Sequence, residues 1–411
     1  MRCSAGRMQT KPSWSVMHAL DRRSTALLAR YQAVRSASLT LLPFLNAEDC
    51  CVQATSEASP LKWHLAHTSW FFETFILADD AGYPTFNPAF RFLFNSYYNG
   101  VGAQHPRLQR GLLTRPTLDE VLAYRAHVDL HMHDRIAQGL APADMLELGL
   151  QHEQQHQELI HTDIKILLSM NPLQPAVLPL QQTSIPAAEA TQWIACHGGV
   201  VVIGNQDEGF SFDNERPPHS VYLAPFSIAS GLVSNEDYLA FIEDDGYDKP
   251  SLWLAEGWDW VRREQVRMPL HWRYEQVGGW QEFSLQGVQP LHKKQPVTHV
   301  SFFEADAFAR WSGARLPTES EWEQAARAQS QLLEGLFGQC WQWTASSYAP
   351  YPGFVEATGA VGEYNGKFMV NQMVLRGSSA ATPPDHARVS YRNFFPTHAR
   401  WQLTGIRLAR N

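Results

Sequence analysis

The segment Gln151–Asp163 reads QHEQQHQELIHTD, and it decides how we expect the first half of this chain to fold. Most of its residues are good helix formers, and a helix places side chains four positions apart on one face. His152 and His156 are such a pair, so both imidazoles can bind one transition metal. The segment therefore predicts a helix that presents two metal ligands.

A second histidine-rich segment lies upstream. Ser59–Glu73 reads SPLKWHLAHTSWFFE and places His64 and His67 on another predicted helix. Imidazole is a good ligand for iron, zinc, copper and nickel, so a site of three histidines from two helices is chemically reasonable. We therefore take a metalloenzyme as the leading hypothesis.

Histidine spacing alone does not define such a site. The chain has 17 histidines in 411 residues, and His127 and His131 share the same four-residue spacing, with His133 beside them. Because these three lie among charged residues, we expect them to be structural. The wider sequence pattern is what favours His152 and His156.

Composition excludes several classes of protein. The net charge of -8 is spread along the chain without a basic stripe, which disfavours nucleic-acid binding. No apolar run is long enough to span a membrane, and the N-terminal segment lacks the apolar core of a signal peptide, so we expect a cytoplasmic enzyme. The cysteines are too scattered for a disulfide framework or a zinc knuckle: Cys3, Cys50, Cys51, Cys196 and Cys340.

Helical patterns dominate residues 1–172, which we expect to form one domain. The connection 84–110 is long and irregular, as functional loops often are. Thr117 and Glu120 form a capping box that starts the third helix. Four helices with one long crossover predict a four-helix bundle, a fold that often binds metals in its core. The predicted helices are Leu20–Leu45, Ser59–Ala78, Thr117–Gly139 and Pro142–Met170.

The pattern changes after Met170. Residues 173–190 are rich in Pro, Gln and Ala and predict a linker packed along the surface. Residues 191–411 show short alternating strands with many Gly and Pro turns, which predict an α+β domain. Strands are expected in GGVVVIGN (198–205), HSVYLAPFSIA (219–229) and VLRGSSAAT (374–382), and helices at Ser234–Asp244 and Phe303–Ser312.

This second half resembles the formylglycine-generating-enzyme fold, a variant of the C-type-lectin architecture. The resemblance rests on blocks in the family's order, among them QPVTHVSFFEADAFARWSGARLPTESEWEQAAR (295–327), QCWQWTASSY (339–348) and TGIRLAR (404–410). Oxidases of that fold work through a cysteine pair, whereas this domain has only Cys196 and Cys340. We therefore expect it to form a wall of the substrate site and not to be a formylglycine oxidase.

The helical half looks like a DinB-type bundle, and the two halves together resemble the EgtB-type ergothioneine sulfoxide synthases. The match includes FRFLFNSYYNGVGAQHPRLQRGLLTRPT (90–117), HEQQHQELIHTDIK (152–165) and YRNFFPTHARWQLTGIRLAR (391–410). It implies an iron(II) enzyme that uses O2 to join sulfur to C2 of the imidazole of hercynine, a trimethylated histidine. The closely similar selenoneine synthases use a selenosugar, so the donor stays open among cysteine, γ-glutamylcysteine and a selenosugar.

The resemblance also implies the metal ligands. His67, His152 and His156 match the family's iron ligands, which leave up to three positions on the metal for oxygen and substrates. His64 lies one turn before His67, and we expect it to support a ligand or the core.

Two carboxylates follow on the same predicted helix. Asp163 continues the stripe of positions 152, 156, 159 and 163, so it either orients an imidazole or forms a surface ion pair. Glu158 lies two residues after His156 and is expected to point away from the ligands.

Three residues of the long connection acquire roles from the same resemblance. Tyr97 and Tyr98 match a tyrosine pair of the branch that uses free cysteine, in which a phenol beside the iron supplies a proton or hydrogen atom. The alternative is a pair that merely packs the loop. Arg91 is expected to bind a substrate carboxylate through its guanidinium.

Hercynine recognition is expected at Gln155, Asn393 and Phe394, which match the family's positions. An aromatic face attracts a quaternary ammonium, although packing in the core is the competing interpretation for Phe394. Trp343 and Trp401 are expected to be core residues.

The chain departs from the family's pattern at two places. Residues 377–382 read GSSAAT where the family usually has GGSCAT, and Trp341-Gln342-Trp343 replaces Trp-Glu-Trp. We expect the first change to alter the substrate wall and to bear on the identity of the donor.

Two other functions stay open at this point. An oxygen-independent thiol transferase of the DinB group would use zinc, and a lectin-like relative would bind a ligand without catalysis. The histidine triad with Tyr97 and Tyr98 argues against the binder, and oxygen dependence separates the two enzymes.

Overall fold

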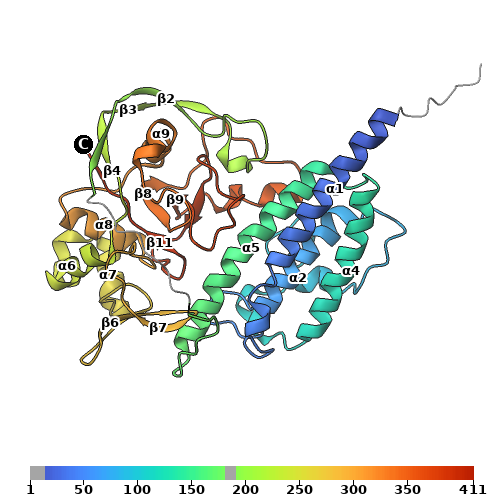
Figure 1. Cartoon of the computed structure of the whole chain (residues 1–411), viewed down its shortest axis with the longest axis horizontal. Helices are drawn as coiled ribbons and strands as arrows, with labels where there is room; N and C mark the ends of the chain where they lie inside the picture. The colour runs from blue at the N-terminus through green and yellow to red at the C-terminus, as the bar shows by residue number, and fades with distance from the viewer. Residues whose placement is uncertain (1–13, 181–190) are drawn as a thin grey trace, which may run out of the picture.

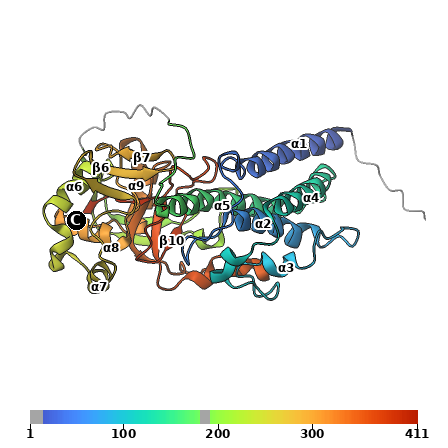
Figure 2. The same cartoon turned by 90° about the horizontal axis from the view of Figure 1, so that it is seen from below.

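The computed structural model describes residues 14–180 and 191–411. A helical half packs beside a sheet-rich half, and helix α5 lies between them (Figures 1 and 2). This confirms the predicted fold class, a helix bundle followed by an α+β domain. The N-terminal segment with Cys3, and residues 181–190 of the predicted linker, lie outside the described residues. Within the described part, none of the helices has the length and apolar character needed to cross a membrane.

The helical half contains four long helices near their predicted places. The predicted capping box of Thr117 and Glu120 is confirmed at the start of the third. The first helix ends earlier than predicted, and Pro43 lies in a separate 3-10 turn, because proline lacks a backbone N–H and clashes with the preceding turn. The helices are α1 (Trp14–Ala37), α2 (Leu61–Phe72, extended by the π-helical η2, Glu73–Leu77), α4 (Leu118–Ala137) and α5 (Ala143–Met170).

The strands of the sheet-rich half are short. The described residues form sheets of order β1-β4-β12, β10-β9-β8-β11, β2-β3 and β5-β6-β7. The predicted strand at 219–229 is divided into β3 and β4, and the one at 374–382 ends at Gly377, whose φ is +94°. The bounds are β1 Trp193–Cys196, β2 Gly199–Ile203, β3 His219–Leu223, β4 Phe226–Ala229, β5 Trp272–Glu275, β6 Gly279–Ser284, β7 Gly287–Pro290, β8 Trp341–Ser347, β9 Met373–Gly377, β10 Asn393–Phe395, β11 Thr404–Gly405 and β12 Ala409–Arg410.

Four helices accompany these strands, two more than predicted. The start of α9 has a sequence signature that the prediction did not use, because Thr318 and Glu321 form a capping box. The helices are α6 (Asn235–Glu243), α7 (Ala255–Glu264), α8 (Phe302–Trp311) and α9 (Glu319–Gln329). The described part of the linker runs along the β6–β7 hairpin, where Val177 and Leu178 donate backbone hydrogen bonds to the carbonyl of Leu285.

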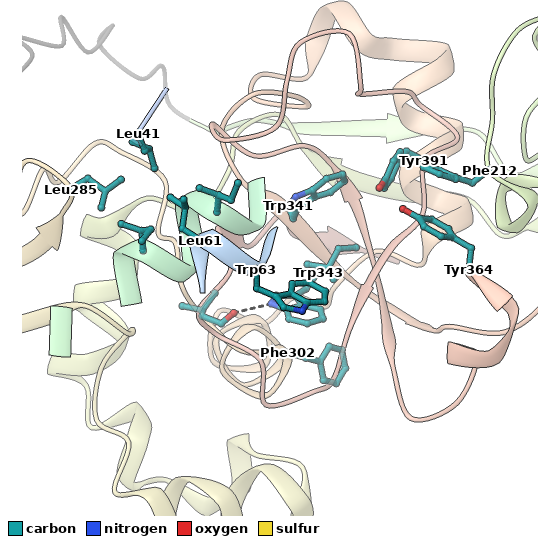
Figure 3. Packing of buried hydrophobic residues seen from close by; sticks show 14 of the residues in the cluster. Leu41, Leu61, Trp63, Phe212, Leu285, Phe302, Trp341, Trp343, Tyr364 and Tyr391 are labelled. Atoms are coloured by element: carbon teal, nitrogen blue, oxygen red, sulfur yellow. Dashed lines mark hydrogen bonds between the residues drawn. The ribbon is translucent and has the colours of Figure 1, made fainter. Parts of the chain in front are cut away.

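One hydrophobic cluster extends through both halves. It includes Trp63 of α2 and both Trp341 and Trp343 of β8, which Figure 3 shows in one close view. Trp343 is fully buried and donates its ring N–H to the carbonyl of Val300, so it is a core residue as predicted. Shared burial of this kind holds the two halves together.

A buried ion cluster fixes α5 within the bundle. The carboxylate of Glu153, fully buried, accepts hydrogen bonds from Arg35 (2.9 Å), Arg125 and Ser38 (2.6 Å). Burial opposes ionisation, but the charges of Arg125 and Arg35 lower the pKa of Glu153 to about 2. Because Glu153 is next to His152, the cluster also sets the rotation of the helix that carries the histidines.

We predict that Arg125→Ala destabilises the protein by about 3–5 kcal/mol, since it removes a partner of a buried charge. The control is Arg310→Ala, which breaks an exposed pair with Asp306 and should change stability by less than about 1 kcal/mol. Urea denaturation followed by far-ultraviolet circular dichroism measures both. Equal effects of the two substitutions would contradict the role given to the cluster.

Candidate metal centre

A cavity of about 240 Å³ lies where the two halves meet. Its walls come from α2, α5 and the long connection on one side, and from the sheet-rich half on the other. Helices α2 and α5 and residues 391–402 are far apart in the sequence, but they line the same cavity. His152 and His156 both line it.

Three histidines converge beside this cavity. His67 of α2 and the pair His152 and His156 of α5 are buried, and their ligand atoms lie within 4.8 Å of one another. The Nε2 atom of His152 is 3.2 Å from that of His67 and 3.1 Å from that of His156. Two ligands at right angles, each about 2.1 Å from a shared ion, stand about 3.0 Å apart, so this spacing suits a metal.

Hydrogen bonds on the far side of the rings support the same conclusion. Nδ1 of His67 is 2.7 Å from the carbonyl oxygen of Phe94, so this nitrogen carries the proton and Nε2 has the lone pair. Nδ1 of His156 is 2.7 Å from Nδ1 of His64. The Nε2 atoms of His67 and His156 both lie close to that of His152, and one cation among the three rings would satisfy every lone pair that these atoms carry.

The protonation states also suit a metal. Burial, with a contribution from the neighbouring His152, lowers the pKa of His67 and of His156 well below the usual value of 6.5. Burial likewise lowers the pKa of His152 to about 3. The three imidazoles are therefore neutral near pH 7, which is the form that binds metals.

Asp163 and His64 lie behind the triad. Nε2 of His64 is 3.0 Å from Oδ2 of Asp163, and both residues are buried. Asp163 thus contacts an imidazole and does not form a surface ion pair. The other histidine pair differs, because His127 and His131 contact the backbone carbonyls of Pro84 and His127.

The residues predicted in the long connection separate into two groups. Tyr97 lines the cavity, and burial raises its pKa above the usual value of 10. Tyr98 is fully buried behind it, against Trp70. Arg91 is exposed, donates to the carbonyl of Val101 and is not among the residues that line the cavity, so nothing in the structure supports its predicted contact with a substrate carboxylate.

Arg107 and Arg110 line the cavity, whereas Arg91 does not. Arg110 is buried and donates to the hydroxyls of Ser59 (2.9 Å) and Ser96 (3.1 Å), and no described carboxylate pairs with it. Burial, together with the charge of Arg107, lowers its pKa to about 9. The sequence prediction missed both, although two arginines three residues apart in a functional loop were a usable signal.

Gln155 lines the cavity between two tyrosines of the other half. Its side-chain carbonyl accepts from the hydroxyl of Tyr364, and its amide nitrogen donates to the hydroxyl of Tyr391. In Figure 3 these two hydroxyls lie close together. Nothing in the sequence placed Tyr364 or Tyr391 near Gln155, because the pairs are more than 200 residues apart.

Asn393 and Phe394 of β10 also line the cavity, as their predicted roles require. The ring of Phe394 stacks on Tyr348 with centroids 4.0 Å apart, and Phe368 lies beside it at 5.9 Å. Trp401, predicted as core, is buried but also forms part of the cavity wall.

Glu158 has partners that the sequence did not predict. This carboxylate lines the cavity and accepts hydrogen bonds from Trp341 (2.6 Å), Ser379 (2.6 Å) and Thr382 (2.8 Å). Burial raises its pKa, and the three donors oppose that shift. Residues 377–382 were expected to alter the substrate wall because of their changed sequence, but they do not line the cavity. Instead, Ser379 and Thr382 of this segment donate hydrogen bonds to the carboxylate of Glu158.

Comparison with known proteins matches both halves. Residues 30–160 match the DinB superfamily, and residues 181–332 match the sulfatase-modifying factor enzyme 1-like domain. A formylglycine-generating enzyme from Streptomyces coelicolor is 34% identical but covers 36% of this chain and 48% of that protein. The four described cysteines, among them Cys196 and Cys340, are free thiols. Fold and site thus define a DinB bundle joined to a formylglycine-generating-enzyme-like domain.

Two relatives match nearly the whole chain. A hercynine oxygenase from Mycobacterium tuberculosis is 31% identical and covers 91% of this chain and 96% of that protein. A second, from Mycolicibacterium smegmatis, is 30% identical with the same coverage. The chain belongs to the hercynine oxygenase (EgtB-type) family, which confirms the resemblance found in the sequence.

We predict that His156→Ala abolishes metal binding, since it removes one of three converging nitrogens. The matched control is His131→Ala, which removes a histidine of the bundle away from the cavity and should leave binding unchanged. Metal content after anaerobic loading with iron(II), measured by plasma mass spectrometry, gives the result. Retention of the full metal content by His156→Ala would refute the ligand assignment.

Proposed function

We propose that this chain is a nonheme iron(II) oxygenase that uses O2 to form a carbon–sulfur or carbon–selenium bond at C2 of the imidazole of hercynine. The observation that carries the proposal is the convergence of three neutral imidazoles on a buried cavity in a chain of the hercynine oxygenase family. His67, His152 and His156 would hold the iron, which supplies the one-electron chemistry with O2 that side chains lack. Three protein ligands suit an open catalytic site.

Hercynine would bind against residues of both halves. Gln155, whose amide is held by Tyr364 and Tyr391, presents a fixed polar group to the imidazole. The face of Phe394 attracts the trimethylammonium, an interaction of roughly 1–2 kcal/mol when water is excluded. Asn393 beside it offers a polar contact to the same substrate.

The sulfur or selenium donor would occupy the side of the cavity lined by Arg107 and Arg110. A buried guanidinium without a carboxylate partner favours an anionic ligand, because the charge is otherwise poorly compensated. Arg110 therefore takes the role that the sequence gave to Arg91. Cysteine, γ-glutamylcysteine and a selenosugar remain the candidate donors.

Tyr97 would act as the acid. Tyr97 lines the cavity, and its raised pKa keeps it protonated at neutral pH, so it has a proton to give. Tyr98 packs behind Tyr97 with ring centroids 4.7 Å apart and would hold that ring in place.

The function is tested with protein loaded anaerobically with iron(II), then given hercynine, O2 and the three donors in competition. We expect an O2-dependent adduct, identified by mass spectrometry as a sulfoxide or a selenium compound. An adduct formed equally well without O2 on the zinc-loaded protein would indicate a thiol transferase. Bound hercynine with no product from any donor would indicate a binding protein.

We predict that Tyr97→Phe keeps the iron but lowers the yield of adduct at least about tenfold, with O2 consumed in oxidising the donor instead, because general acid catalysis typically contributes 10²–10⁴-fold. Tyr98→Phe is the matched control and should keep most of the adduct. The measurement that distinguishes the two variants is the ratio of adduct to oxidised donor, determined by chromatography. An unchanged ratio in Tyr97→Phe would remove its role as the acid.

A further inference from the structure

We propose that Asp163 and His64 form a hydrogen-bonded relay that fixes one tautomer of His156 and makes it the strongest of the three metal ligands. The inference rests on the proposed metal centre and concerns the residues behind it. Asp163 and His64 are positioning residues in this proposal, since they act through His156.

The direction of each hydrogen bond follows from the contacts of Asp163. Its Oδ2 accepts from the backbone N–H of Ser59 (2.8 Å) and lies 3.0 Å from Nε2 of His64. An ionised carboxylate only accepts, so for a neutral His64 we assign the proton to Nε2, which leaves a lone pair on Nδ1. That Nδ1 is 2.7 Å from Nδ1 of His156, which must therefore be the donor. Nε2 of His156 is left unprotonated, facing the other ligands.

The three ligands consequently differ in what lies behind them. His67 donates to the backbone carbonyl of Phe94, and His156 donates to a histidine that is itself bound to a carboxylate. Nδ1 of His152 has no hydrogen-bond partner among the described residues. A carboxylate behind an imidazole raises its basicity more than a carbonyl does, so donor strength falls from His156 to His67 to His152.

Burial makes the relay hard to replace. His64 is 2% exposed and Asp163 is 6% exposed, and the ring of Trp63 packs edge-on against His64 with centroids 5.7 Å apart. Both residues line the cavity, and protein contacts occupy Oδ2 of Asp163 and both ring nitrogens of His64. Removing the carboxylate therefore frees His64 to reverse its tautomer, which would place a proton on Nε2 of His156 where the metal should bind.

The test is the dissociation constant of cobalt(II), measured by visible absorption on metal-free protein. Asp163→Ala should weaken binding about 10–100-fold. Asp163→Asn keeps an oxygen that accepts from His64 but loses the charge, so it should restore part of the affinity. His64→Gln has an amide oxygen that can accept from His156, so it should also keep part of the cobalt(II) affinity. His131→Ala should leave that affinity unchanged.

The outcomes separate the relay from the proposed function. Equal cobalt(II) affinity of the unsubstituted protein and both Asp163 variants would overturn the relay and leave the metal centre intact. Asp163→Ala and Asp163→Asn could also lose cobalt(II) affinity equally, while their metal-free forms keep the melting temperature of the unsubstituted protein. That result would overturn the assigned tautomer. If Asp163→Ala does not fold, Asp163→Asn and His64→Gln decide. Absence of binding by the unsubstituted protein would defeat the metal centre itself.

Discussion

Helix α5 is buried between the two halves although it is rich in charged and amide side chains, and the need to satisfy these groups organises the structure. A buried carboxylate without partners is costly, so each one must find donors. Glu153 finds them in Arg35 and Arg125 of the bundle, and Glu158 finds them in Trp341, Ser379 and Thr382 of the other half. Opposite faces of one helix are thus fixed, and its rotation is fixed with them.

This rotation brings together the three histidines of the candidate metal centre. With Glu153 held in the bundle and Glu158 held by the sheet-rich half, His152 and His156 face α2 and meet His67. The same burial that makes the helix costly to place lowers the pKa of all three imidazoles, so they are neutral when the protein is folded. Packing and ligand chemistry therefore have one physical cause, the exclusion of water from the contact between the halves.

In the proposed function the sheet-rich half contributes substrate recognition. Cys196 and Cys340 are buried free thiols, and the residues of this half that line the cavity include Tyr364, Tyr391, Asn393 and Phe394. The altered segment 377–382 acts on the cavity through Glu158. A change of sequence near a site can therefore affect it through a buried hydrogen bond without lining it.

The sequence alone determined the helices and the division into two halves, because these features depend on local periodicity. The i, i+4 histidines, the capping box at Thr117 and the change of texture after Met170 predicted the helices, the two halves and the pair His152 and His156, and the family resemblance added His67. Only the tertiary structure decided which side chains share the cavity, since such contacts join positions far apart in the chain. The structure places Arg110, and not Arg91, in the cavity wall and brings Tyr364 to Gln155, because the direction of a loop side chain depends on packing that no local pattern encodes.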